Sequence, residues 1–199
     1  MQVTVFPRIT EVKSLYDIDI KEFTGFLRLL PDFFTACGGQ FKPIRSDIEG
    51  NIKKLETASK VFSAGKLPTL LAAEQPEARY SDNSGSVGLL WLGRTLEFLV
   101  GILQNLITSM EDDSMRQIVK QAYEVTLQRH HNRVMRHTFR LLLHILPKRA
   151  QFIQRLALGK ESCEAMVLSE ASRFLTVLKP VAEQLTDILV RFDLETVSP

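Results

Sequence analysis

Three polar side chains share one face of a predicted helix that begins at Ser46. Asp47, Asn51 and Lys54 follow one another at steps of four and three residues, so on a helix they lie within an arc of about 60°. A carboxylate, an amide and an ammonium group in one row can bind the hydroxyl groups of a polar ligand. The same spacing is also typical of a solvated helix face, and an acid in the first turn complements the helix dipole.

The only tryptophan, Trp91, precedes Arg94 by three residues in a largely apolar segment. An indole ring stacks well on the apolar face of a sugar, whereas a buried guanidinium group needs a partner. Two interpretations follow. Either both residues face a polar ligand at one end of their helix, or Trp91 fills the core while Arg94 pairs with a carboxylate of another helix.

Four histidines lie between residues 130 and 144. His130, His137 and His144 are seven residues apart, which is about 10 Å along a helix for each step. No Cys, Asp or Glu lies between them at helical spacing, so the sequence predicts no metal site. His131 lies on a different stripe and is predicted to face inward, as a core histidine or as a hydrogen-bond donor to a ligand. That stripe continues through Val134, Thr138, Leu142 and Ile145.

The sequence contains none of the common catalytic or cofactor motifs, such as G-x-S-x-G, a glycine-rich phosphate loop, H-E-x-x-H or C-x-x-C. We therefore expect no catalytic residues, no cofactor and no enzymatic activity. The two cysteines, Cys37 and Cys163, give neither a disulfide framework nor a zinc-ligand spacing, and they are typical of a reducing cytosol.

The composition is that of a folded protein, since 45% of the 199 residues are hydrophobic and 24% are charged. This length fits one domain, which we expect to span residues 1–199. A net charge of +2 gives no strong field for nucleic acid, so a DNA-binding protein is disfavoured although residues 129–149 are basic. The N-terminus lacks the pattern of a secretory signal, which favours a cytoplasmic location.

Helical periodicity dominates the chain. Segment 87–110 is apolar on nearly every side and predicts a central helix covered all round, while Arg94 and Glu97 within it argue against a membrane span. The other predicted helices are 21–37 with a kink at Pro31, 46–61 with a Ser46–Glu49 capping box, 68–78, 115–145, 148–158, and 163–194 with a kink at Pro180. The sequence thus predicts one all-α domain of about eight helices.

Three of these segments resemble motifs of the glycolipid transfer protein family, in the same order. LPDFFTACGGQFKPIRSDIEGNIKKLE resembles the family's signature around its first ligand-binding helix, and LLWLGRTLEF resembles the segment with its stacking tryptophan. AYEVTLQRHHNRV, followed by the proline of ILPKRAQF, resembles the helix with the headgroup histidine, which corresponds to His131. The similarity runs through most of the chain.

The resemblance implies a two-layer helical sandwich around an apolar cavity that carries one sphingolipid between membranes without chemistry. Since burial is worth about 0.8 kcal/mol per methylene, a two-chain lipid needs such shielding to cross water. The implied headgroup-binding residues are Asp47, Asn51, Lys54, Trp91, Arg94 and His131. The implied lining of the lipid-chain tunnel is Phe34, Ile44, Leu127, Phe139, Leu143 and Phe152.

Asn51 and Trp91 separate the two headgroup classes, because family members that bind sphingolipid phosphates are expected to carry basic residues at these positions. The resemblance therefore favours a sugar headgroup, whereas Lys54 and Arg94 are common to both classes. Two features depart from the family pattern: Arg133 replaces a membrane-inserting tryptophan, and the tail FDLETVSP lacks a terminal tyrosine. Docking to anionic membranes is therefore expected to use Arg133, Arg136, Lys148 and Arg149.

The sequence is thus interpreted as that of a monomeric cytoplasmic carrier of glycosphingolipids, which contacts membranes peripherally and transiently and binds no nucleic acid. The nearest alternative is a carrier of the same kind that acts on ceramide 1-phosphate. A rival from another class is a helical adaptor with a filled core, in which the Asp47 row is a solvated face.

Overall fold

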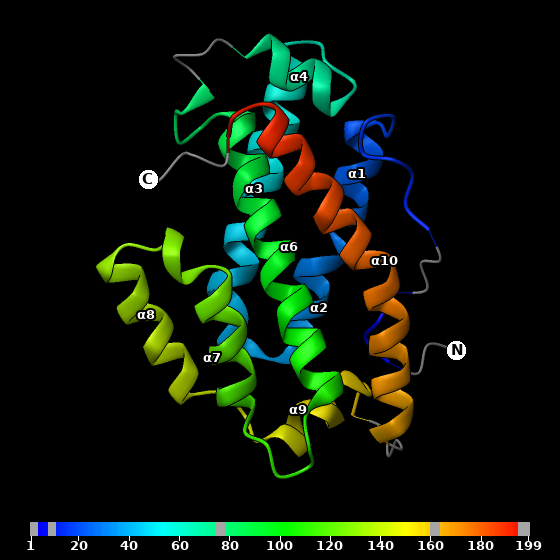
Figure 1. Ribbon diagram of the computed structural model, residues 1–199, viewed down its shortest axis with the longest axis vertical. Helices are drawn as coiled ribbons and strands as arrows, with labels where there is room; N and C mark the ends of the chain where they lie inside the picture. Colours follow the sequence, from blue (N-terminus) through cyan, green and yellow to red (C-terminus); the bar gives the residue numbers. More distant parts are fainter. Residues whose placement is uncertain (1–3, 8–10, 75–78, 160–163, 195–199) are drawn as a thin grey trace.

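The computed structural model describes residues 4–7, 11–74, 79–159 and 164–194, and the regular elements in these ranges are helices (Figure 1). The α-helices are α1 Ile20–Leu27, α2 Leu29–Cys37, α3 Lys42–Val61, α4 Leu67–Ala73, α6 Gly85–Thr108, α7 Met115–Val125, α8 Arg133–His144, α9 Arg149–Leu156 and α10 Glu164–Arg191. Two 3₁₀ turns, η1 Gly39–Phe41 and η2 Gln128–His130, join α2 to α3 and α7 to α8. The predicted all-α class is confirmed.

Helix α6 is the central helix, as its apolar surface predicts. It packs against α3, α10 and α7, and its N-terminus is held by two side chains. The Ser84 hydroxyl accepts a hydrogen bond from Val87 N (3.0 Å), and the buried Glu74 carboxylate accepts from Gly85 N (2.7 Å). In the described part of the chain, α6 alone is long and apolar enough to cross a membrane, but 83% of its most apolar window is buried inside the protein.

The helices form two layers, as the family resemblance implies. In Figure 1, α10, α6, α7 and α8 lie toward the viewer, and α1, α2 and α3 lie behind them. The layers meet closely where α6 crosses α3 at Gly88. A Cβ atom at this position would lie only 2.9 Å from the carbonyl oxygen of Asn51, so the absence of a side chain lets the two helices touch. This contact brings the polar row of α3 beside the Trp91 turn of α6.

A single cluster of buried apolar side chains extends through the described chain from Phe6 to Leu194. This continuity agrees with the expectation of one domain over residues 1–199, which stays a prediction. Cys37 belongs to this core with no exposed surface, and its burial raises the pKa of the thiol far above the ordinary value. Cys163 lies outside the described residues.

Two predicted helix boundaries are wrong for local reasons. Helix α3 begins at Lys42, four residues before Ser46, because η1 leads directly into it and Pro43 suits its first turn. Ser46 therefore caps nothing, and Glu49 pairs instead with Arg45 at 3.1 Å. The predicted helix over 115–145 is two helices, since the chain leaves helical geometry at Thr126 and starts again after Asn132, whose side chain accepts a hydrogen bond from Met135 N.

The two predicted proline kinks have different outcomes. Pro31 has no N–H to bond the carbonyl of Leu27, and the predicted helix over 21–37 divides at Arg28 into α1 and α2. Pro180 lies within α10, which continues without division from Glu164 to Arg191. The short helix expected over 68–78 is α4, which ends at Ala73; residues 75–78 lie outside the described ranges.

Candidate functional site

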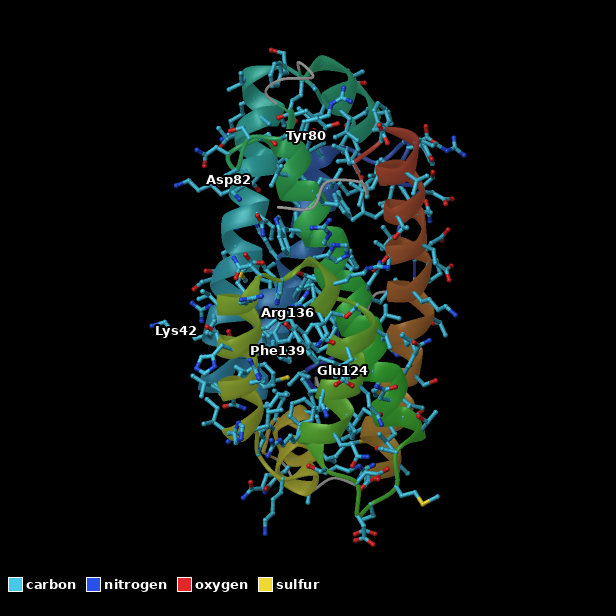
Figure 2. The ribbon with its side chains drawn as sticks, turned by 60° about the vertical axis from the view of Figure 1, so that its left-hand side comes forward. Lys42, Tyr80, Asp82, Glu124, Arg136 and Phe139 are labelled. Carbon is cyan, nitrogen blue, oxygen red and sulfur yellow. The ribbon has the colours of Figure 1, made fainter. Side chains whose placement is uncertain are left out.

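A largely apolar pocket of about 550 Å³ opens between α3, α6 and α8. Figure 2 shows α8, marked by the labels of Arg136 and Phe139, between α7, which carries Glu124, and the start of α3 at Lys42. Each helix contributes side chains at helical spacing, and the chain between α7 and α8 closes one side. The lining residues are Pro43, Ile44, Asp47, Trp91, Thr95, Phe98, Leu127, His131, Met135, Thr138, Phe139 and Leu142.

The polar row of α3 lies at the edge of this pocket. Asp47 lines it, and the buried amide of Asn51 donates to Asp47 Oδ2 at 3.2 Å. Desolvation of the Asp47 carboxyl by the surrounding protein raises its pKa, while the Lys54 ammonium and the Asn51 hydrogen bond oppose this shift. Asp47 is itself an exposed residue, joined to Asn51 by one hydrogen bond. The row is therefore solvated at its Asp47 end, where Asp47 also borders the pocket, and buried at Asn51.

Trp91 and Arg94 are joined as a pair on α6. The Arg94 guanidinium lies over the indole ring, 4.9 Å from its centroid, and only 2% of Arg94 is exposed. Trp91 itself is half-buried and lines the pocket. The cation therefore covers part of the indole and leaves Trp91, rather than Arg94, as the side chain in the pocket wall.

His131 lies in the break between α7 and α8, in extended backbone. The sequence predicted an inward-facing histidine on a continuous helix; the inward position is present, but the helix is not. Of the predicted stripe, Thr138 and Leu142 line the pocket, whereas Val134 and Ile145 are 73% and 62% exposed. The break turns α8 relative to α7, so positions beyond it do not continue the earlier stripe.

The His131 ring is enclosed by aromatic and cationic groups. Its centroid lies 5.8 Å from that of Trp91, and its Nδ1 lies 3.1 Å from the Tyr123 hydroxyl. Burial, followed by the charges of Arg136 and Arg94, lowers the pKa of His131. The imidazole is therefore neutral near pH 7, with one nitrogen that donates and one that accepts.

The expected tunnel residues divide into two groups. Ile44, Leu127 and Phe139 line the pocket. Phe34, Leu143 and Phe152 are buried but do not line it. Phe34 packs on Phe41, with ring centroids 5.7 Å apart, and Phe41 packs on Phe152 at 6.3 Å. These rings belong to the buried apolar core and not to the pocket wall.

Sequence reasoning missed several pocket residues, although the signal was available. Thr95 and Phe98 follow Trp91 by four and seven residues and so share its face of α6. Met135 was also missed, although it lies three and seven residues before Thr138 and Leu142 of the predicted stripe and shares their face of α8. The contact of Tyr123 with His131 was not predicted either, because it joins α7 to the segment after the helix break.

The expected docking residues are not equivalent. Arg133 and Lys148 are exposed, and Arg136 is half-buried with its Nε donating to the carbonyl of Gln128 at 3.0 Å. The expectation for Arg149 is wrong, because its side chain is only 3% exposed and pairs with Glu164 at 2.7 Å. A guanidinium group held in that way joins α9 to α10 and does not reach a membrane surface.

No metal site is present in the part of the chain that the structure describes, where no three His, Cys, Asp or Glu side chains gather to hold an ion. His130 and His137 lie on different elements, one in η2 and the other in α8. His130 therefore does not share a helix face with His137, whereas His137 and His144 both lie on α8.

Comparisons with known proteins agree with this architecture. The family model for glycolipid transfer protein matches residues 18–158. Glycolipid transfer protein of Danio rerio is 29% identical over 167 residues, which cover 79% of this chain and 80% of the relative. Glycolipid transfer protein 3 of Arabidopsis thaliana is 25% identical, with coverages of 96% and 83%.

Solved structures share the fold. A structure that describes how FAPP2 selects simple glycosphingolipids with the GLTP fold has a TM-score of 0.78 at 24% identity, covering 97% of this chain and 98% of the other. Human ceramide-1-phosphate transfer protein in complex with 12:0 ceramide 1-phosphate has a TM-score of 0.78 at 19% identity, with coverages of 91% and 90%. With a family model that covers most of the chain, the protein belongs to the glycolipid transfer protein family, whose members are lipid transfer proteins and not enzymes.

Proposed function

We propose that this protein carries glycosphingolipids between membranes, with the sugar at the polar edge of the pocket and the lipid chains in its apolar interior. The observation that carries the proposal is the meeting of Trp91, Asp47 and His131 in one largely apolar pocket. An indole ring stacks on a sugar, and a carboxylate accepts hydrogen bonds from two hydroxyl groups.

The placement of cations favours a sugar over a phosphate. A phosphate site in proteins presents several basic side chains to the ligand. Here the side chains at the pocket edge are neutral or acidic, since His131 is a neutral imidazole and Asp47 is a carboxyl group. Lys54 and Arg94 lie next to this edge but are not among the lining residues of the pocket. Ceramide 1-phosphate, which human ceramide-1-phosphate transfer protein binds, is the alternative cargo.

Membrane contact is proposed for the outer surface of α8 and the start of α9. Val134 and Leu141 are 73% and 56% exposed. Arg133, directly before Val134, and Lys148, directly before α9, are also exposed. Exposed apolar side chains flanked by cations suit a transient contact with an anionic lipid surface. We further propose that the protein acts as a cytoplasmic monomer, associated only peripherally with membranes.

A headgroup-exchange variant tests the proposal. Transfer of galactosylceramide and of ceramide 1-phosphate between vesicles is measured for wild type and for the double variant Asn51→Lys with Trp91→Arg. Wild type is expected to prefer galactosylceramide, and the double variant is expected to lose that preference because it replaces the stacking platform with two cations. A wild-type preference for the phosphate would reject the sugar assignment.

A further inference from the structure

The hydroxyl group of Tyr123 has one hydrogen-bond partner in the described part of the chain, Nδ1 of His131 at 3.1 Å. Tyr123 lies on α7 with 4% of its surface exposed. Its ring stacks on Phe139, with centroids 3.7 Å apart and planes 8° from parallel. The phenol is therefore fixed by packing on one side, and its hydroxyl has a single direction in which to bond.

The donors and acceptors available to Tyr123 and His131 determine which of the two groups donates the hydrogen bond. Burial raises the pKa of Tyr123, so the phenol keeps its proton at neutral pH. If His131 Nδ1 carried a proton and donated to the phenol, the buried phenolic hydrogen would have no acceptor among the described residues, at a cost of about 1–3 kcal/mol. If the phenol donates to Nδ1, that cost does not arise.

The second nitrogen of the neutral ring must then carry the hydrogen. Nε2 has no hydrogen-bond partner within the described residues, and His131 is one of the side chains that line the pocket. The Nε2–H group is thus a donor available to an oxygen atom of the bound lipid. It complements Asp47, which presents an acceptor to the same pocket.

We propose that Tyr123 is a positioning residue for lipid binding, which donates to His131 Nδ1 and so holds His131 with its Nε2–H free to bond an oxygen of the ligand. The phenol also fixes the orientation of a ring that no helix holds, since His131 lies in the extended segment before α8. The expected effect of Tyr123 on glycolipid binding rests on the proposed function. The tautomer of His131, in contrast, is a property of the lipid-free protein.

The test begins with Tyr123→Phe, which keeps the stacked ring and removes only the hydroxyl group. Nitrogen-15 NMR of the lipid-free protein at pH 7.5 reports which ring nitrogen of His131 is protonated. Wild type is expected to show the Nε2–H form, and the variant a mixture of both tautomers. Tyr16→Phe is the matched control, since the Tyr16 hydroxyl is also buried but has no hydrogen-bond partner in the described residues; it should leave the His131 signals unchanged.

Binding of galactosylceramide from phosphatidylcholine vesicles gives the second readout. Tyr123→Phe should weaken binding by about 3- to 10-fold, as expected for one lost hydrogen bond. In a His131→Leu background the same substitution should have no further effect, because Tyr123 acts through His131. An equal loss in both backgrounds would mean a purely structural role and would overturn the proposal.

The two measurements separate this proposal from the proposed function. An unchanged tautomer in Tyr123→Phe overturns the positioning role, whichever lipid the protein carries. If wild type binds no galactosylceramide while the tautomer changes as expected, the positioning role stands and the glycolipid assignment fails. A cooperative thermal unfolding transition well above the assay temperature, in wild type and variant alike, establishes that both are folded in these comparisons.

Discussion

At the level of single residues, Asp47 is the strongest acceptor that the pocket offers to a sugar. We expect Asp47→Val to weaken galactosylceramide binding by about tenfold or more, because a hydrogen bond to a charged group contributes about 1.5–3 kcal/mol. Isothermal titration or fluorescence of the single tryptophan, which lies in the same pocket, measures this loss. Glu49→Val, on the same helix but paired outward with Arg45, is the control. Equal binding by wild type and Asp47→Val would remove Asp47 from the site.

His130 makes the stability of the protein depend on pH. Burial, followed by the charges of Arg94, Arg129 and His131, lowers the pKa of His130 to about 4. Its Nε2 also accepts a hydrogen bond from Arg129 at 2.9 Å, which requires the unprotonated nitrogen. The unfolded chain, with an ordinary pKa of about 6.5, therefore binds more protons than the folded protein between pH 6.5 and pH 4.

The free energy of unfolding is thus expected to fall as the pH decreases from about 6.5 to about 4. Replacing His130 with Gln should make the free energy of unfolding depend less steeply on pH between about 6.5 and about 4. The control His137→Gln, at an exposed position on α8, should leave this dependence unchanged. Urea unfolding at several pH values measures both. A slope that is the same in wild type and His130→Gln would show that His130 is not protonated on unfolding in this window.

At the level of elements, the contact of α3 with α6 at Gly88 connects stability to the site. A methyl group there would press on the Asn51 carbonyl oxygen, 2.9 Å away, and on Lys54 Cβ, 3.0 Å away. Gly88→Ala should therefore cost about 1–3 kcal/mol and also weaken lipid binding, because it separates the polar row of α3 from Trp91. Both effects are measured on one variant, by urea unfolding and by lipid titration.

Gly50 provides the matched control on α3. A Cβ atom at Gly50 would meet nothing within 4 Å, so Gly50→Ala should stabilise the helix by about 0.5–1 kcal/mol and leave lipid binding unchanged. If Gly88→Ala were as harmless as Gly50→Ala, the close approach of the two helices would not be what positions the polar row.

The helices also show how far the sequence could predict the structure. Segment 87–110 was correctly predicted as the central helix, because burial all round leaves a clear apolar pattern. The break between Val125 and Arg133 was not, because it contains no glycine or proline and only Asn132 marks the new helix start. The break is a tertiary feature, since it places Leu127 and His131 in the pocket wall.

The candidate site was predictable to a similar degree. Helical spacing brought Asp47, Asn51 and Lys54 together, and the family resemblance, not the spacing, implied that Trp91 and His131 share their site. The fold places Asp47, Trp91 and His131 in the wall of one pocket. The misassignment of Arg149 has the same origin: the sequence shows a cation next to Lys148, and only the packing shows its ion pair with Glu164. Sequence patterns identify faces of helices, whereas contacts between helices decide which faces meet.

At the level of the whole molecule, the proposed docking surface predicts a dependence on membrane charge. Charge reversal by Arg133→Glu with Lys148→Glu should slow transfer from anionic vesicles by about tenfold or more, since each cation near such a surface contributes about 1 kcal/mol. Neutral vesicles should show little change, and salt should reduce the difference. Lys13→Glu with Lys179→Glu changes the net charge equally at other exposed positions and serves as control. Equal slowing by both pairs would exclude a local docking surface.

The central claim is that the whole fold encloses one glycosphingolipid, and retention of lipid tests it most directly. The wild-type protein is incubated with vesicles that contain equal amounts of galactosylceramide and ceramide 1-phosphate, separated from them, and weighed by native mass spectrometry. We expect a monomer that retains one molecule of galactosylceramide. A protein that retains ceramide 1-phosphate instead would contradict the sugar assignment, and one that retains no lipid would contradict the carrier function itself.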